Sequence, residues 1–186
     1  RAEMTYRTII SQEPSNSSAY HLLGLIAHQV RKHDQAEALI QKSIALNPDS
    51  AVLYANLGNV LKDKKDYAKA AHCYHKAIEI NPQFPEAYNG LGIVMCGKGR
   101  TEKGIACFKK ALSLRPEFAH ACNNLGNAYK TLNDNEQAIR YYKKAIQMQP
   151  DHAEAHSNLG TVLKSEGKIH AAETMYAKAL DLNPMC

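Results

Sequence analysis

Asparagine side chains are the groups in this sequence whose type and spacing most clearly suggest a chemical role. Three segments share one pattern: "ANLGNVLK" at 55–62, "NNLGNAYK" at 123–130 and "SNLGTVLK" at 157–164. Asparagine is a poor helix former, yet each segment reads as helix. Its amide places a carbonyl acceptor beside an NH₂ donor, which complements the polar groups of a peptide backbone. A row of such amides can hold an extended chain without reading its side chains.

Histidine and cysteine raise the alternative of a metal site. "HCYH" at 72–75 puts His72 and His75 about one helical turn apart. A second group comprises His120, Cys122, His152 and His156. Zinc requires a closed set of four ligands at fixed spacing, and neither group supplies one. Because the sequence also has no Gly-rich phosphate loop and no GxSxG nucleophile motif, we predict no catalytic residue, no metal and no cofactor.

The elements that position these side chains follow from an internal repeat of 34 residues. Proline recurs at this interval, as Pro14, Pro48, Pro82, Pro116, Pro150 and Pro184. A Leu-Gly pair recurs as well, with its glycine at Gly24, Gly58, Gly92, Gly126 and Gly160. Within each repeat, positions 4, 7, 8 and 11 form one helical stripe, positions 20, 24 and 27 form another, and the proline at position 32 ends the second helix. Each repeat therefore predicts two helices.

The glycine at position 8 indicates close helix packing. A glycine inside a helix costs ~1 kcal/mol relative to alanine, so its recurrence implies that a side chain is forbidden there. We expect the glycine to lie against the small residue at position 20 of the second helix.

This pattern of aromatic, Leu-Gly, Ala, Tyr or Phe, Ala and Pro resembles that of the tetratricopeptide-repeat (TPR) family. The resemblance implies an all-α fold: a right-handed superhelix, or α-solenoid, of five helix-turn-helix repeats plus one leading helix. Residues 1–16 match the second helix of a truncated repeat, and the full repeats are 17–50, 51–84, 85–118, 119–152 and 153–186. Neither end has a polar capping helix, so we expect part of a longer protein, whose ends can also self-associate.

In TPR arrays the side of the first helix opposite the packing stripe lines a concave groove. Positions 5, 6, 9 and 12 lie on that side. The predicted peptide-binding residues are Asn56, Asn59, Asn89, Asn123, Asn124, Asn127, Asn158, Lys62, Lys130 and Lys164. The row resembles the asparagine ladder of O-linked N-acetylglucosamine transferases, which implies backbone binding by Asn56, Asn124 and Asn158, with an interruption at Gly90 and an end at Leu22. The alternative is that these amides are solvated or bonded within the array.

Two functions fit this pattern. The first is a protein–protein interaction scaffold that binds an extended segment of a partner in an asparagine-lined groove. The second is the substrate-recruiting region of a larger enzyme, similar to O-linked N-acetylglucosamine transferases or another transferase, whose catalytic domain lies outside this segment. In both hypotheses the segment itself is not an enzyme. The open reading frame beyond Cys186 distinguishes them.

Composition and charge restrict which classes of partner and which cellular compartment we expect. The net charge of +5 is too mild to indicate nucleic-acid binding, for which a concentrated basic face with aromatic partners is expected. The lysine pairs 109–110 and 143–144 fall on the solvent side of second helices, as is typical of a solvated outer face. No segment has the roughly 18 apolar residues of a membrane span, and none resembles a signal peptide. We therefore expect a soluble, cytoplasmic protein with reduced thiols, a protein or peptide partner, and neither a membrane nor a nucleic-acid partner.

Overall fold

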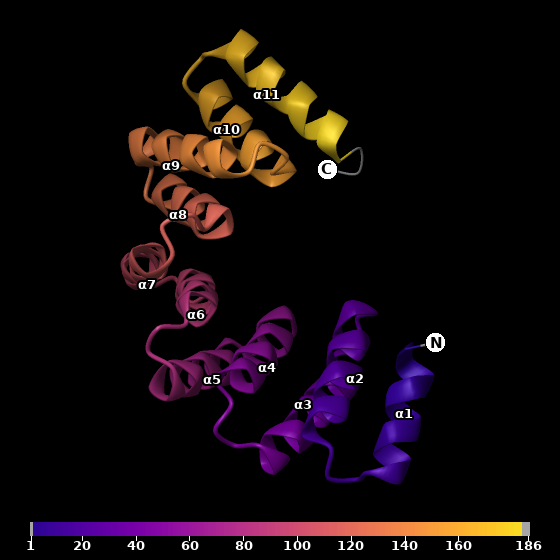
Figure 1. The fold of residues 1–186 in the computed structure, drawn as a ribbon. Coiled ribbons are helices and arrows are strands. Elements are labelled where there is room, and N and C mark those ends of the chain that lie inside the picture. The colour runs from indigo at the N-terminus through magenta and orange to yellow at the C-terminus, as the bar shows by residue number, and fades with distance from the viewer. Residues whose placement is uncertain (1, 184–186) are drawn as a thin grey trace. The chain divides into compact units, whose positions relative to one another are not determined.

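The computed structural model describes residues 2–183 and places eleven α-helices in them (Figure 1). They are α1 (Ala2–Gln12), α2 (Ser17–Gln29), α3 (His33–Leu46), α4 (Ala51–Asp63), α5 (Tyr67–Ile80), α6 (Pro85–Gly97), α7 (Thr101–Leu114), α8 (Ala119–Thr131), α9 (Asn135–Met148), α10 (Ala153–Ser165) and α11 (Ile169–Leu182). The predicted all-α class, with one leading helix followed by five helical pairs, is confirmed. Pro184 and Cys186, which the repeat pattern includes, lie outside the described residues.

The helices form two compact units, Arg1–Val94 and Met95–Cys186. In the first unit α2 packs on α3 and α4 on α5; in the second unit α8 packs on α9 and α10 on α11. The first helices of successive repeats also touch within each unit, α2 with α4 and α8 with α10. Side chains on that face can therefore bond from one repeat to the next.

The turn inside each helical pair has one residue with left-handed backbone at position 15 of the repeat. The residues are Arg31, Lys65, Gly99, Asn133 and Gly167, with φ between 60° and 75°. Glycine and asparagine adopt this conformation readily, whereas Arg31 and Lys65 do so at a steric cost. A turn of one geometry therefore closes every pair, although the sequence at this position varies.

Side-chain caps fix the starts of several helices. The Asn16 amide oxygen accepts from the Ala19 N–H at 3.0 Å, and Asp66 and Asp134 cap α5 and α9 in the same way. Caps of this kind contribute about 1 kcal/mol each.

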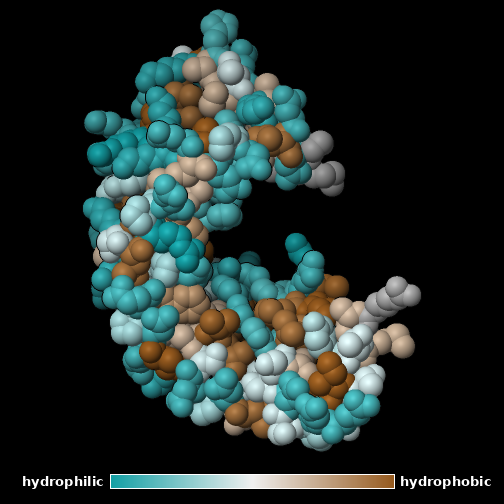
Figure 2. Space-filling model, in the orientation of Figure 1, coloured by the Kyte–Doolittle hydropathy of each residue, from teal (hydrophilic) through white to brown (hydrophobic). Residues whose placement is uncertain are grey.

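The core of each pair centres on the side chain at position 24. Tyr74 and Tyr142 are 1% and 0% exposed. A Cβ added at Gly58 would lie 2.8 Å from the Tyr74 ring, and one at Gly126 would lie 2.6 Å from the Tyr142 ring. For these two glycines the nearest atoms belong to position 24. The expected approach to position 20 is found at Gly24 and Gly160, where a Cβ would lie 3.4 Å and 3.2 Å from the carbonyl oxygens of Ala36 and Ala172. Outside this core the surface of both units is mainly hydrophilic, with scattered apolar patches (Figure 2).

Candidate functional site

The amides at position 9 are held by buried tyrosines of the same repeat. The Tyr74 hydroxyl donates to Asn59 Oδ1 at 2.8 Å, and the Tyr142 hydroxyl donates to Asn127 Oδ1 at 2.7 Å. Burial raises the pKa of both tyrosines above their ordinary value, so the hydroxyls stay protonated and remain donors. Since each amide oxygen is engaged, its NH₂ group is the part that remains for a ligand.

The amides at position 6 are bonded through their NH₂ groups, which donate to side chains of the preceding repeat. Asn56 Nδ2 donates to His21 Nε2 at 2.8 Å, and Asn158 Nδ2 donates to Asn123 Oδ1 at 3.0 Å. Burial lowers the pKa of His21, which keeps its ring neutral and able to accept. Each bond uses an NH₂ hydrogen, and the Oδ1 atoms of Asn56 and Asn158 accept no hydrogen bond within residues 2–183.

Each unit therefore presents an acceptor and a donor in fixed orientations. In the first unit the free Oδ1 of Asn56 and the free NH₂ of Asn59 stand three residues apart on α4. In the second unit the free NH₂ of Asn127 and the free Oδ1 of Asn158 lie on α8 and α10. We call Asn56 with Asn59 the amide face of the first unit, and Asn127 with Asn158 the amide face of the second unit. A peptide backbone alternates N–H and C=O groups, so a surface offering both functions complements it.

Asn123 does not belong to this face. The residue is 1% exposed, and its carbonyl serves as the acceptor for Asn158. The prediction that its side chain faces a ligand is wrong, because position 5 turns toward the neighbouring first helix. Asn123 instead orients the amide that stays accessible.

The remaining predicted residues differ in their availability. Asn89 and Asn124 are half-buried, and each already interacts with another part of the chain. Lys62 lies 3.3 Å from Asp63, whose other oxygen binds His28 at 2.8 Å. A final pair, Lys130 and Lys164, is exposed and makes no ion pair with a described residue.

The interruption at Gly90 has a steric cause within the first unit. A Cβ at Gly90 would lie 2.4 Å from two carbons of the Tyr74 ring and 2.8 Å from its hydroxyl oxygen. The same ring already touches Gly58 and orients Asn59. An asparagine at residue 90 would therefore displace the tyrosine that holds the neighbouring amide.

Family comparisons agree with the helical pairs. A model described as TPR repeat matches residues 58–99 and 126–167, and models described as Tetratricopeptide repeat match 17–50, 39–72, 85–118 and 153–185. Together they span 17–118 and 126–185.

The chain belongs to the TPR family. This TPR chain resembles TTC0263, a thermophilic TPR protein of Thermus thermophilus, with a TM-score of 0.80, 22% identity, and coverage of 90% of this chain and 92% of that one. PilF of Pseudomonas aeruginosa gives a TM-score of 0.81 at 22% identity, with coverage of 90% of this chain and 76% of the PilF chain. YrrB, another TPR protein, gives a TM-score of 0.65 at 21% identity, with coverage of 96% of this chain and 92% of the YrrB chain. A search of curated protein sequences gives no match. These likenesses show the fold, and the TPR fold supports a protein–protein interaction scaffold.

The histidines of the second unit have structural partners in this TPR array. His152 caps α10, its Nδ1 accepting from the Ala155 N–H at 3.3 Å, and its ring lies 4.9 Å from that of His120. His156 Nε2 lies 2.9 Å from the Pro150 carbonyl oxygen. Within residues 2–183, no group of three or more His, Cys, Asp or Glu residues is arranged to hold a metal ion.

No helix within residues 2–183 has the length and apolarity needed to cross a membrane.

Sequence analysis missed the tyrosines that orient the amides, although the repeats carry a signal for them. Position 9 is polar in the repeats that have tyrosine at position 24. These pairs are Asn59 with Tyr74, Asn127 with Tyr142, and Thr161 with Tyr176. Position 9 is apolar where position 24 lacks a hydroxyl, as in Leu25 with Ile40 and Ile93 with Phe108. Comparing the two positions across the five repeats would have identified the hydrogen-bonded pairs.

Proposed function

We propose that the chain is a scaffold in which the amide face of each unit binds an extended peptide segment of a partner protein. The observation that carries the proposal is the fixed orientation of the amides. Internal hydrogen bonds leave NH₂ donors at Asn59 and Asn127 and carbonyl acceptors at Asn56 and Asn158. Oriented groups bind with a smaller entropic loss than freely rotating ones.

The expected affinity is modest. Each hydrogen bond between protein and peptide contributes about 0.5–1.5 kcal/mol net, so one unit alone offers little. The exposed cations of Lys130 and Lys164 add attraction for an acidic side chain on the second unit. YrrB is described as a TPR protein with an unusual peptide-binding site, which supports peptide binding as a use of this fold.

Substitution of asparagine by aspartate tests the proposal with little disturbance of the fold. Asn59→Asp and Asn127→Asp each keep the oxygen that accepts from the tyrosine and remove the outward NH₂ donor. Peptides selected from a displayed random library against the wild-type chain serve as the probes. We expect each substitution to weaken its peptides about tenfold, because a peptide carbonyl then faces an acceptor, while the melting temperature stays near that of the wild type.

Gln41→Glu is the matched control, since it makes the same change of charge at an exposed position of α3. Its affinity for the selected peptides should equal that of the wild type. Unchanged binding by both aspartate variants, measured by isothermal titration calorimetry, would refute the proposal.

The alternative proposal places the same faces in a larger enzyme, where they recruit substrates to a transferase domain. It is supported by the resemblance of the asparagine row to that of O-linked N-acetylglucosamine transferases. A catalytic domain encoded in the same reading frame, together with loss of protein substrates in the aspartate variants, would favour it over a free scaffold.

A further inference from the structure

A cationic groove lies among α7, α8 and α9 of the second unit, on side chains other than those of the amide face. α7, α8 and α9 enclose a cavity of about 360 Å³. Its lining includes the apolar side chains Leu112, Cys122 and Met148, with Lys109 and Lys144 beside them. The groove therefore combines an apolar lining with two ammonium groups.

Aromatic rings hold these cations in place. Tyr129 and Tyr141 are stacked, with centroids 5.6 Å apart and planes 6° apart. Lys109 Nζ lies 5.8 Å from the centre of the Tyr129 ring, while Lys144 Nζ and the Arg140 guanidinium lie 5.5 Å and 6.0 Å from that of Tyr141. Such cation–π contacts contribute about 0.5–1 kcal/mol at exposed sites. The interaction of Lys109 with the Tyr129 hydroxyl also raises the pKa of the ammonium, which keeps it charged.

No carboxylate of the described residues neutralises this groove. Lys109, Arg140 and Lys144 are exposed and form no ion pair within residues 2–183. Three cations gathered around two tyrosines without a counter-ion attract a negatively charged partner.

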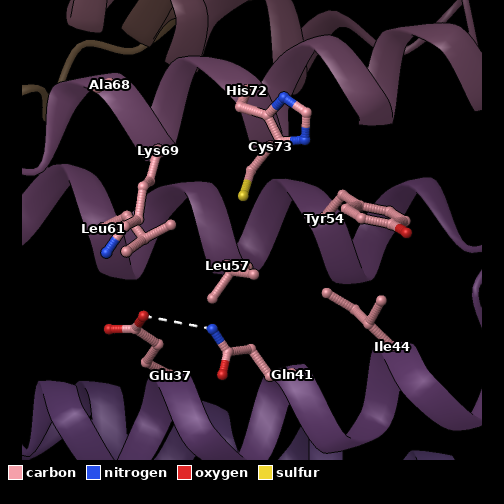
Figure 3. A pocket seen from close by; sticks show the side chains of 10 residues that line it. All are labelled: Glu37, Gln41, Ile44, Tyr54, Leu57, Leu61, Ala68, Lys69, His72 and Cys73. Atoms are coloured by element: carbon pink, nitrogen blue, oxygen red, sulfur yellow. Dashed lines mark hydrogen bonds between the residues drawn. The ribbon is translucent and has the colours of Figure 1, made fainter.

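The equivalent groove of the first unit shows that this charge is not a general property of the repeat. α3, α4 and α5 enclose a cavity of about 510 Å³, lined by Gln41 where the second unit has Lys109 (Figure 3). Lys76, the counterpart of Lys144, is paired with Glu79 at 2.7 Å, whereas Gln147 takes the place of that glutamate in α9. Of these two grooves, the one on α7–α9 is therefore the one that leaves its lysines without carboxylates.

We propose that this groove binds an acidic peptide segment with an apolar side chain between its carboxylates. The apolar side chain would enter the cavity beside Leu112 and Met148, and the carboxylates would pair with Lys109 and Lys144. Charge complementarity favours this partner. Single-stranded nucleic acid fits less well, because base stacking needs an accessible ring face and the tyrosine faces are used by each other and by the cations.

Fluorescence polarisation with a labelled acidic peptide tests the proposal on the full chain. The probe alternates aspartate and glutamate around a central leucine, and a second peptide has serine in place of the leucine. We expect Lys109→Gln/Lys144→Gln to weaken the leucine peptide roughly tenfold, since two charge-assisted hydrogen bonds are lost. Met148→Ser, at an exposed site, should weaken the leucine peptide and leave the serine peptide unchanged.

Lys69→Gln/Lys76→Gln is the matched control, because it removes the same charge from the equivalent groove of the first unit. Its affinity for the leucine peptide should stay near that of the wild type. Equal weakening by both double variants would mean that net charge alone attracts the peptide, and would overturn the proposal. Tighter binding of a labelled thymidine oligonucleotide than of the peptide, lost in Lys109→Gln/Lys144→Gln, would overturn the choice of a peptide partner.

Discussion

Gly90→Ala tests whether a steric clash with Tyr74 explains the interruption of the asparagine row at Gly90. Helix propensity and the steric clash predict opposite effects of this substitution on stability. Helix propensity alone favours the substitution by about 1 kcal/mol. The new Cβ would stand 2.4 Å from Cε1 and Cζ of the Tyr74 ring, far inside van der Waals contact. Overpacking of this kind costs roughly 1–3 kcal/mol, and displacement of the ring also breaks the bond to Asn59, worth about 1 kcal/mol. We therefore expect a net loss of roughly 1–3 kcal/mol.

Urea unfolding followed by circular dichroism measures this change in free energy. In a thermal melt, the melting temperature should fall by about 2–12 °C for a chain of this size. A double-mutant cycle with Tyr74→Leu sharpens the test, because an aliphatic residue already occupies the same repeat position at Ile40. In that background Gly90→Ala should cost much less, and the coupling free energy isolates the contact. A Gly90→Ala chain as stable as the wild type, or more stable, would refute the reasoning.

The same contacts support three further predictions. Gly126→Ala should destabilise the second unit as Gly90→Ala does the first, since its Cβ would lie 2.6 Å from the Tyr142 ring; hydrogen exchange of the α8 and α9 amides would report the loss. Tyr142→Phe should lower the free energy of unfolding by about 1 kcal/mol and broaden the side-chain amide resonances of Asn127, whereas sharp, unshifted resonances would contradict the assigned bond. Burial, and secondly the nearby His120, lower the pKa of His152 from 6.5, so His152 is protonated at higher pH in the unfolded chain than in the folded chain. The free energy of unfolding should therefore decline as pH falls from about 6.5 toward the folded-state pKa. In urea titrations His152→Asn, which keeps a capping acceptor, should reduce this pH dependence.

The repeat itself was predictable because its signals are local. Proline at position 32 ends a helix, and an apolar stripe identifies the packed face of each helix. These rules need only a few neighbouring residues, and the helical pairs agree with them. The neighbour of the glycine at position 8 was not predictable in this way, because it depends on how far the second helix slides along the first.

The candidate site was predicted only at the level of a helix face. Asn123 and Asn124 are adjacent and fall on the same side of a helical wheel, yet Asn123 is 1% exposed and Asn124 is half-buried. A step of 100° along one helix cannot resolve this difference, which arises from the neighbouring first helix. The lysines of the second helices show the same limit. Their solvent exposure was predicted, whereas their arrangement around Tyr129 and Tyr141 depends on contacts among α7, α8 and α9.

The amide face of the first unit is continuous with the core, and this connection constrains how it can change. Asn59 is oriented by Tyr74, and the ring of Tyr74 is accommodated by Gly58 and Gly90. A polar residue at position 9 therefore requires a hydroxyl at position 24, and the size of that ring restricts position 6 of the next repeat. Under the proposed function, substitutions at Tyr74 should alter peptide binding without touching the peptide, because they release the Asn59 amide. The orientation of the amides at the surface is therefore set partly by residues buried in the core.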